Sequence, residues 1–262
     1  MIRALYTAAS GMSAQQANLD TVANNLANSA TVGFRGRRMQ FEDMIYQNLV
    51  MPGAAASPQT TQAGLQIGLG TRSASSEVLM TQGDFNQTSN ALDLAIQGQG
   101  FFQVSRPDGT IAYTRAGNFQ LNNAGTITTT DGYSLIPNIT IPSNATNVTI
   151  SQYGVVSATL PGQQTPAQLG QITLATFPNP GGLESVGGNL LLPTGSSGNA
   201  ITDEPGGTSG VGTIQQGYLE NSNVDVVEEF VQMVLAQRAY ESNSKVVHVA
   251  DDMYSQINNM VR

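Results

Sequence analysis

The last forty residues of the chain, Asn223 to Arg262, carry apolar residues in steps of three or four along almost their whole length. This spacing places them in one stripe on a helix, and no Pro or Gly interrupts the segment. Asn223 or Asp225 is suited to cap the start of that helix. A long helix cannot bury such a stripe against itself, so the sequence predicts that it lies on another helix. The stripe consists of Val227, Val231, Leu235, Ala239, Ser242, Val246, Ala250, Met253, Ile257 and Met260.

The candidate partner is a helix at the other end of the chain, over Ile2 to Ala30. Its heptad positions, which recur every seven residues as in a coiled coil, are Leu5, Met12, Leu19 and Leu26. The charges are complementary: residues 1–40 have four basic against one acidic residue, and residues 220–262 have three basic against seven acidic. We therefore expect long N- and C-terminal helices packed as a coiled-coil-like pair. A hairpin within one molecule and additional packing between molecules are both compatible with this pattern.

Three asparagines stand near the end of the N-terminal helix, at Asn24, Asn25 and Asn28, although Asn is a poor helix former. In a packed bundle, Asn can fix the register by bonding across helices. Gly33 then breaks the helical pattern, and Phe34 gives the following turn an apolar anchor. Earlier in the same helix, Ser10-Gly11 indicates a close approach of two helices.

The middle of the chain predicts a loop followed by a β domain. Residues 49–76 include a stretch rich in Pro, Gly and Ala, which is typical of an extended segment. Over residues 77–220, short apolar runs alternate with turn signals, which predicts hairpins. The expected pairs are Phe101 to Val104 with Ile111 to Thr114 across Pro107-Asp108-Gly109, Phe119 to Leu121 with Thr126 to Thr128, and Val148 to Ile150 with Val155-Val156. The predicted fold is α+β: residues 1–48 and 221–262 form an assembly core, and a mainly antiparallel β domain is inserted between them.

Composition excludes several classes of protein. The absence of Cys rules out disulfides and thiolate metal sites, and the net charge of −8 argues against nucleic-acid binding. No apolar run is long enough to span a membrane, and the N-terminus shows no cleavable secretory pattern. The single histidine, His248, has no second histidine with which to form a zinc site. We expect no catalytic residue, metal or cofactor. The short basic cluster of Arg35, Arg37 and Arg38 is typical of a solvated or acid-paired helix face.

Motifs at both ends of the chain carry a family resemblance. Those near the N-terminus are Ser10-Gly11-Met12, Gln15, Asp20, Ala23-Asn24-Asn25-Leu26-Ala27-Asn28 and Thr31-Val32-Gly33-Phe34-Arg35. Those near the C-terminus are Ser222-Asn223-Val224-Asp225, Glu228-Glu229-Phe230 and Gln237-Arg238-Ala239-Tyr240-Glu241-Ser242-Asn243-Ser244-Lys245. Over essentially its whole length, the chain resembles the bacterial flagellar basal-body rod and hook family. Internal motifs, among them Gly98-Gln99-Gly100-Phe101-Phe102 and Pro137-Asn138-Ile139-Thr140-Ile141-Pro142, are similar to those of the distal-rod members.

The resemblance implies a structural subunit of the flagellar distal rod. Such subunits form a hollow helical tube in the periplasm, which transmits torque to the hook and encloses an export channel. The implied partners are further copies of the chain, proximal rod proteins, the hook protein, the rod cap, the P- and L-ring bushing and the flagellar type III export apparatus. Nucleic acid is not among them, and the chain is not expected to span a membrane. Tyr46 to Gly70 resembles an insertion that stiffens the distal rod.

The candidate functional residues are therefore contacts for self-assembly. They are Leu5, Met12, Leu19, Asn24, Asn25, Leu26, Asn28, Gly33, Phe34, Val227, Val231, Leu235, Ala239, Val246, Met253 and Ile257. A proximal rod or hook subunit is the alternative within the family. Outside it, a cell-wall glycan hydrolase would need two carboxylates that converge in a cleft. A secreted adhesin with coiled-coil ends would need a secretory leader.

Overall fold

The computed structural model describes residues 2–50, 55–56, 59–60, 64–162, 165–207 and 210–260. The chain forms two compact units. Unit 1 combines Met1–Ala27, Arg37–Val78 and Asp225–Arg262, whereas unit 2 combines Asn28–Gly36 with Leu79–Val224. The second half of the N-terminal family motif, from Asn28 onwards, therefore belongs to the β-rich unit.

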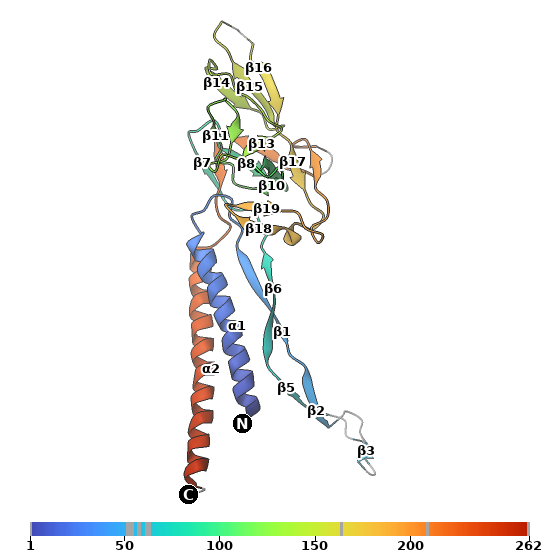
Figure 1. The fold of residues 1–262 in the computed structure, drawn as a ribbon, viewed down its shortest axis with the longest axis vertical. Helices are drawn as coiled ribbons and strands as arrows, with labels where there is room; N and C mark the ends of the chain where they lie inside the picture. The colour runs from blue at the N-terminus through green and yellow to red at the C-terminus, as the bar shows by residue number, and fades with distance from the viewer. Residues whose placement is uncertain are drawn as a thin grey trace. The chain divides into compact units, whose positions relative to one another are not determined.

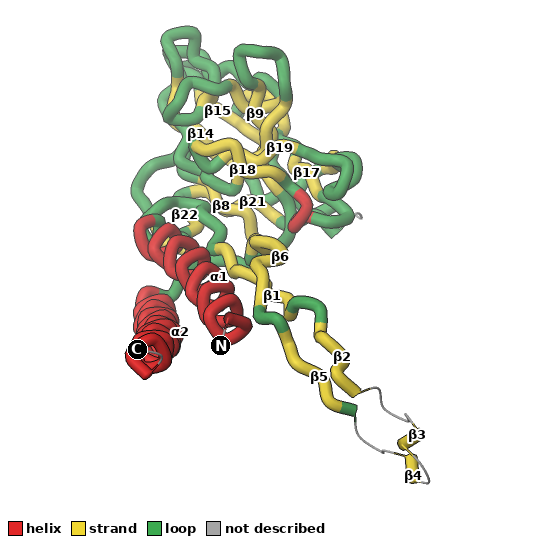
Figure 2. The backbone as a smooth tube through the Cα atoms, turned by 60° about the horizontal axis from the view of Figure 1, so that its bottom comes forward, coloured by secondary structure: helices red, strands yellow, loops and turns green. Residues whose placement is uncertain are grey.

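Unit 1 contains both α-helices of the described chain, α1 (Ile2–Ala27) and α2 (Val226–Met260). They lie side by side and run in opposite directions (Figures 1 and 2). Asp225 caps α2: its Oδ1 accepts hydrogen bonds from the backbone N–H groups of Val227 at 2.8 Å and Glu228 at 3.3 Å. The sequence had left Asn223 and Asp225 as alternatives, and the structure selects Asp225.

Six strands of unit 1 form three antiparallel two-stranded ribbons, which follow one another along the chain. The pairs are β1 (Arg37–Asp43) with β6 (Thr71–Val78), β2 (Tyr46–Val50) with β5 (Leu65–Gly68), and β3 (Ala55–Ala56) with β4 (Gln59–Thr60). Strands β1 and β6 also contact α1, so α1 has a helix on one side and a ribbon on another (Figure 2). Within unit 1, α1 thus packs against more than a single partner helix.

Unit 2 is built around a nine-stranded sheet. Its main path is β11 (Gln120–Leu121), β12 (Ile127–Thr128), β13 (Ser134–Ile136), β9 (Phe101–Ser105), β10 (Ile111–Thr114), β19 (Leu190–Leu192) and β18 (Glu184–Gly187). Strand β17 (Leu174–Thr176) joins β9 and β20 (Ile201–Asp203). A three-stranded sheet consists of β14 (Asn147–Ile150), β15 (Val155–Thr159) and β16 (Ala167–Gln171). A short 3-10 helix spans Pro180–Gly182.

Two further pairs bring the ends of the inserted unit together. Strand β7 (Phe85–Gln87) pairs with β22 (Tyr218–Glu220), and β8 (Leu94–Gln97) pairs with β21 (Thr213–Gln216). Each pair joins a strand near the start of the long β segment to one near its end. The strands at which the chain enters and leaves this β segment therefore lie next to each other.

The core of unit 2 consists of inward-facing residues from many short strands. Phe102 and Phe119 meet edge to face with their ring centroids 5.1 Å apart, and both side chains are buried. The predicted hairpins of this region are confirmed: β9 pairs with β10, β11 with β12, and β14 with β15. Period-two patterning with turn signals was therefore sufficient to identify these local pairs.

The predicted coiled-coil-like pair of long helices is wrong, although the α+β composition holds. The described chain has one N-terminal and one C-terminal α-helix, and most of its remaining elements are strands in a large β-rich body. The heptad residues of α1 are only partly buried, whereas Ala8, Ala14 and Val22 are buried. Because α1 packs against β1 and β6 as well as α2, its buried residues face more than one neighbour and do not form a single heptad seam.

Of the predicted loop over residues 49–76, residues 51–54, 57–58 and 61–63 lie outside the described residues. The described remainder carries β3, β4, β5 and most of β6. Among the helices of the described ranges, none combines the length and apolar character needed to cross a membrane.

Candidate assembly surface

The face of α2 that contacts α1 overlaps the predicted stripe at Ala250 but leaves most of that stripe uncovered. Ala236 and Ala250 are the buried side chains of α2, and Met233, Asn243 and Val247 on the same side are half-buried. Small residues permit a close approach here. A Cβ added to Gly11 would lie 2.8 Å from the side-chain nitrogen of Asn243, which confirms that Ser10-Gly11 marks a close helix–helix contact.

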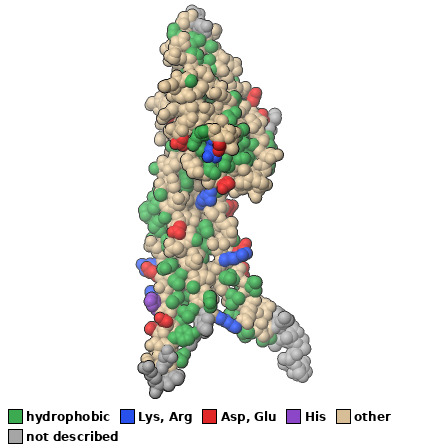
Figure 3. Space-filling view, in the orientation of Figure 1, with side chains coloured by type: hydrophobic (Ala, Val, Ile, Leu, Met, Phe, Trp, Pro, Cys, Tyr) green, Lys and Arg blue, Asp and Glu red, His purple; other side chains and the backbone are tan. Residues whose placement is uncertain are grey.

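The predicted apolar stripe of α2 is largely exposed in the single chain. Leu235 exposes 57% of its surface and Val227 72%, whereas Ala236, the next residue after Leu235, exposes 3%. Successive helical residues point about 100° apart, which explains how one helix carries both faces. Figure 3 shows hydrophobic side chains along the part of the molecule that α2 occupies in Figure 1. The other exposed stripe residues are Val231, Ser242, Val246, Met253, Ile257 and Met260, while Ala239 is half-buried and Ala250 is buried.

Asn25 is the polar link within unit 1. Its buried side-chain amide donates to Glu229 Oε1 on α2 at 2.9 Å and to the Arg37 carbonyl at 2.8 Å, and it accepts a bond from the Arg37 N–H at 2.9 Å. The expectation that an asparagine would bond across the helices is confirmed at Asn25. Burial raises the pKa of the Glu229 carboxyl, with the Asn25 hydrogen bond opposing the shift and the neighbouring Glu228 adding to it.

The remaining N-terminal candidates share no single surface. Asn28 and Phe34 are half-buried in unit 2 and Asn24 is exposed on α1, while Leu5, Met12, Leu19 and Leu26 are half-buried on α1. Gly33 is buried, with φ +69°, and an added Cβ would lie 2.6 Å from the backbone nitrogen of Ala116. A side chain at this position would therefore be strained and would also collide with backbone.

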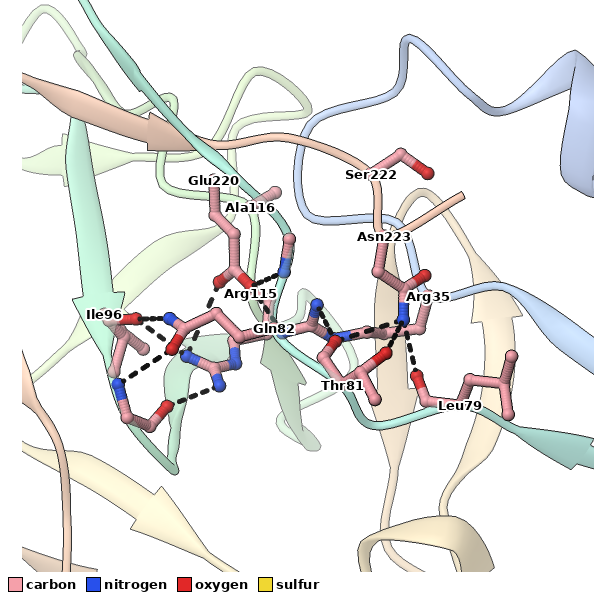
Figure 4. A network of polar contacts seen from close by, with 12 residues as sticks. Arg35, Leu79, Thr81, Gln82, Ile96, Arg115, Ala116, Glu220, Ser222 and Asn223 are labelled. Atoms are coloured by element: carbon pink, nitrogen blue, oxygen red, sulfur yellow. Dashed lines mark hydrogen bonds and ion pairs between the residues drawn. The ribbon is translucent and has the colours of Figure 1, made fainter. Parts of the chain in front are cut away.

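A buried ion-pair network holds the segment around Gly33 to the β strands of unit 2 (Figure 4). Glu220, at the end of β22, is completely buried. Its Oε1 accepts a bond from Arg35 at 2.6 Å, and its Oε2 lies 3.5 Å from Arg115 Nη1. Its backbone carbonyl accepts the N–H of Gly33 at 2.8 Å, and its side chain also accepts the N–H of Gly83 at 3.1 Å. One residue thus ties three distant segments together.

Arg115 is held in place by further contacts. Its guanidinium donates to the carbonyls of Ile96 at 3.2 Å and Gly98 at 2.6 Å, and it lies 5.7 Å from the centre of the Phe101 ring. Burial lowers the pKa of Arg115 to about 10. Glu220 opposes this shift, and the positive charge of Arg35 reinforces it.

Asn223 completes the network at the last turn before α2. Its amide nitrogen donates to the carbonyls of Leu79 at 2.9 Å and Thr81 at 3.0 Å, and its Oδ1 accepts the N–H of Gly36 at 2.7 Å. The Thr81 carbonyl also accepts a bond from Arg35 at 2.8 Å (Figure 4). This network was not among the sequence-derived candidates, although Arg35, Glu220 and Asn223 lie within or beside the terminal motifs.

The basic cluster has the acid-paired character that the sequence favoured, but it does not lie on a helix. Arg35 pairs with Glu220, and Arg38 on β1 pairs with Glu77 on β6 at 3.1 Å. No group of three or more acidic or histidine side chains suited to a metal ion occurs among the described residues.

Comparison with known proteins gives matches along the whole chain. Three family models match: flagella basal body rod protein at residues 5–35, flagellar hook protein FlgE/F/G D1 domain at 95–158, and flagellar basal body rod FlgEFG protein C-terminal at 215–260. The flagellar basal-body rod protein FlgG of Caulobacter vibrioides is 48% identical, over 96% of this chain and 97% of that protein. The FlgG protein of Buchnera aphidicola subsp. Schizaphis graminum is 46% identical, over 99% and 100% respectively.

The chain belongs to the FlgG family of flagellar basal-body rod proteins. It is a structural subunit of the flagellar distal rod, and its location is the flagellar basal body. The first matched model ends at Arg35 and the last begins just before Glu220. The segments that the two terminal family models match therefore include Arg35 and Glu220, which form the buried ion pair.

We predict that Glu220→Gln destabilises unit 2 by about 3–5 kcal/mol, because it leaves two buried arginines without a balancing charge. Hydrogen exchange of the β9 amides reports the stability of this unit. Glu42→Gln is the matched control: it breaks an ion pair with Arg72 of 2.8 Å that is exposed, and should leave β9 exchange unchanged. Equal effects of the two substitutions would contradict the assigned role of Glu220.

We also predict that Asn25→Asp weakens the packing of α1 on α2 by about 1–3 kcal/mol at neutral pH, because it removes a buried donor and faces Glu229 with a second carboxylate. The folded variant should bind more protons than its unfolded state. Its stability should therefore rise as the pH falls through the raised pKa values of this acid pair. Hydrogen exchange of α1 amides between neutral and mildly acidic pH measures the effect. Asn24→Asp, at an exposed neighbour, should show no comparable pH-dependent loss.

Proposed function

We propose that this subunit acts by self-assembly. In the proposal, copies pack their terminal helices against one another in a hollow helical tube, which passes torque to the hook and surrounds an export channel. The observation that carries this proposal is the exposed stripe of α2, with Val231, Leu235 and Val246 each about half exposed. A contiguous apolar face of this kind marks an interaction site, because soluble monomers rarely leave one uncovered.

The stripe fits another copy of the chain better than the subunit's own α1. Within one chain, α1 is already in contact with the Ala236 and Ala250 face of α2 and with the β1–β6 ribbon. The exposed part of the stripe lies outside this contact face, so packing between molecules could cover it without breaking the contact with α1. The sequence-derived candidates on α2 would be the primary assembly contacts, and Leu5, Met12, Leu19 and Leu26 of α1 would contribute their exposed portions.

The proposal divides the chain by role. Residues 1–48 and 221–262 would form the inner core of the tube, residues 49–76 would reach a neighbouring subunit, and residues 77–220 would face outward. Rod placement in the periplasm, export by the type III apparatus without a cleaved leader, and contacts with the proximal rod, hook, cap and ring bushing belong to the same proposal. They rest on family membership.

The ribbon of β2 and β5 supports the proposed reach toward a neighbour. Tyr46, Leu49, Val50, Leu65 and Ile67 are all exposed in the single chain. A two-stranded ribbon has no core of its own and is marginally stable in water unless something covers it. A neighbouring subunit of the tube would provide that cover.

Leu235→Asp should block polymerisation and leave unit 2 folded. In the tube, the substitution would bury an unpaired carboxylate at an apolar contact, at a cost of several kcal/mol in every subunit. Sedimentation and electron microscopy of concentrated protein measure polymer formation, and β9 hydrogen exchange monitors unit 2. Gln237→Asp is the control, because it adds the same charge to an exposed position on the opposite side of α2. Normal tubes built from Leu235→Asp would refute the stripe as an assembly contact.

Deletion of Met51 to Gly64 should change the mechanics of the polymer and leave the subunit folded. Most of this segment lies outside the described residues, and the prediction rests on its Pro, Gly and Ala content and on the exposed ribbon that flanks it. If the segment braces neighbouring subunits, its loss should give a more flexible or curved polymer in electron micrographs. Unchanged straightness with intact assembly would leave it only the role of a spacer.

A further inference from the structure

A small cavity opens beside the buried ion-pair network of unit 2. Its volume is about 80 Å³, and both Arg35 and Arg115 contribute to its wall. Phe101, Thr176 and Phe177 are among the other lining residues. It combines cationic groups at one side with aromatic and aliphatic walls elsewhere. Its volume suits one side chain, and it is too small for a nucleotide-sized ligand.

The charge beside this cavity is not balanced by the chain. Two guanidinium groups, with side chains only 5% and 7% exposed, share the single carboxylate of Glu220. Among the described residues, no other acid forms an ion pair with either arginine. The Nε atoms of both arginines are buried and lack a hydrogen-bond partner in the described structure. One positive charge is therefore left over in a poorly solvated place, where an unpaired charge is costly.

The lining specifies the chemistry of a ligand that would remove this cost. A carboxylate would balance the excess charge, and Phe101 and Phe177 would enclose the short aliphatic stem that carries it. Both aromatic side chains are buried apart from small exposed portions, and their rings meet edge to face with centroids 6.1 Å apart. Walls fixed in this way give the cavity a defined shape before a ligand enters.

We infer that the cavity is a socket for an aspartate or glutamate side chain of a second copy of this chain. The inference rests on the proposed self-assembly. A copy of the chain is a suitable donor because each molecule carries 18 acidic against 10 basic residues. In a helical polymer, the same contact would recur in every subunit. The socket would thus add a directional, charge-assisted contact to the less directional apolar packing of the terminal helices.

Thr176 provides a matched pair of variants to test the socket. It lies on β17, is half-buried and lines the cavity. Thr176→Asp supplies the missing carboxylate from within the subunit, whereas Thr176→Asn has nearly the same shape without the charge. In the monomer, Thr176→Asp should have a higher urea midpoint than Thr176→Asn. Propionate, compared with chloride at equal ionic strength, should stabilise the wild type and Thr176→Asn but not Thr176→Asp.

Assembly of the full-length chain tests the source of the carboxylate. The critical concentration for polymerisation should be about tenfold higher for Thr176→Asp than for Thr176→Asn, the factor that corresponds to the loss of ~1.4 kcal/mol per contact. Equal critical concentrations would overturn the socket, and a propionate effect without an assembly effect would reduce it to an adventitious anion site. No propionate effect in the wild type would overturn it even if Thr176→Asp failed to fold. Failure of the wild type to polymerise would refute self-assembly and with it the second copy as donor.

Discussion

The architecture of unit 2 depends on one buried carboxylate, that of Glu220. It receives bonds or ion pairs from Arg35, Gly83 and Arg115, and its own backbone binds Gly33. These residues come from the segment after α1, the approach to β7 and the end of β10. A buried ion pair adds little net stability compared with apolar packing, but breaking it exposes the full cost of the unpaired charges. Such a contact therefore strongly disfavours any arrangement in which the three segments are not together.

Unit 1 is organised by the opposite kind of interaction. Its contact between helices uses small residues such as Gly11 and Ala236, with Asn25 as a polar tie, while larger apolar side chains such as Leu235 remain exposed. The usual pattern of a monomeric protein, with large apolar residues inside and small or polar ones outside, is reversed on α2. This reversal is what a subunit requires if its terminal helix is completed by packing on other molecules.

The sequence predicted local features well and contacts between distant residues poorly. The two helices, the Asp225 cap alternative and the β9–β10 and β11–β12 hairpins could be predicted because each depends on neighbouring residues, although α1 ends at Ala27 and not at the expected Ala30. The stripe of α2 was also read correctly as apolar, but periodicity does not reveal whether a face meets its own chain or another. The coiled-coil-like pairing with α1 was wrong for that reason. The Arg35–Glu220 pair escaped notice because its members are 185 residues apart in sequence, and neither has a local pattern that identifies its partner.

The low charge of the chain is consistent with this division of labour. Only 11% of its residues are charged, against about a quarter in ordinary soluble domains. In a helical polymer each contact recurs in every subunit, so a like-charged pair at one contact would repel at all of them. A surface rich in neutral polar residues lowers that repulsion and still remains hydrated. Charged side chains then stabilise the subunit best where they are paired inside it, as at Glu220. The positive charge that the two arginines leave unbalanced there can attract the acidic surface of another copy.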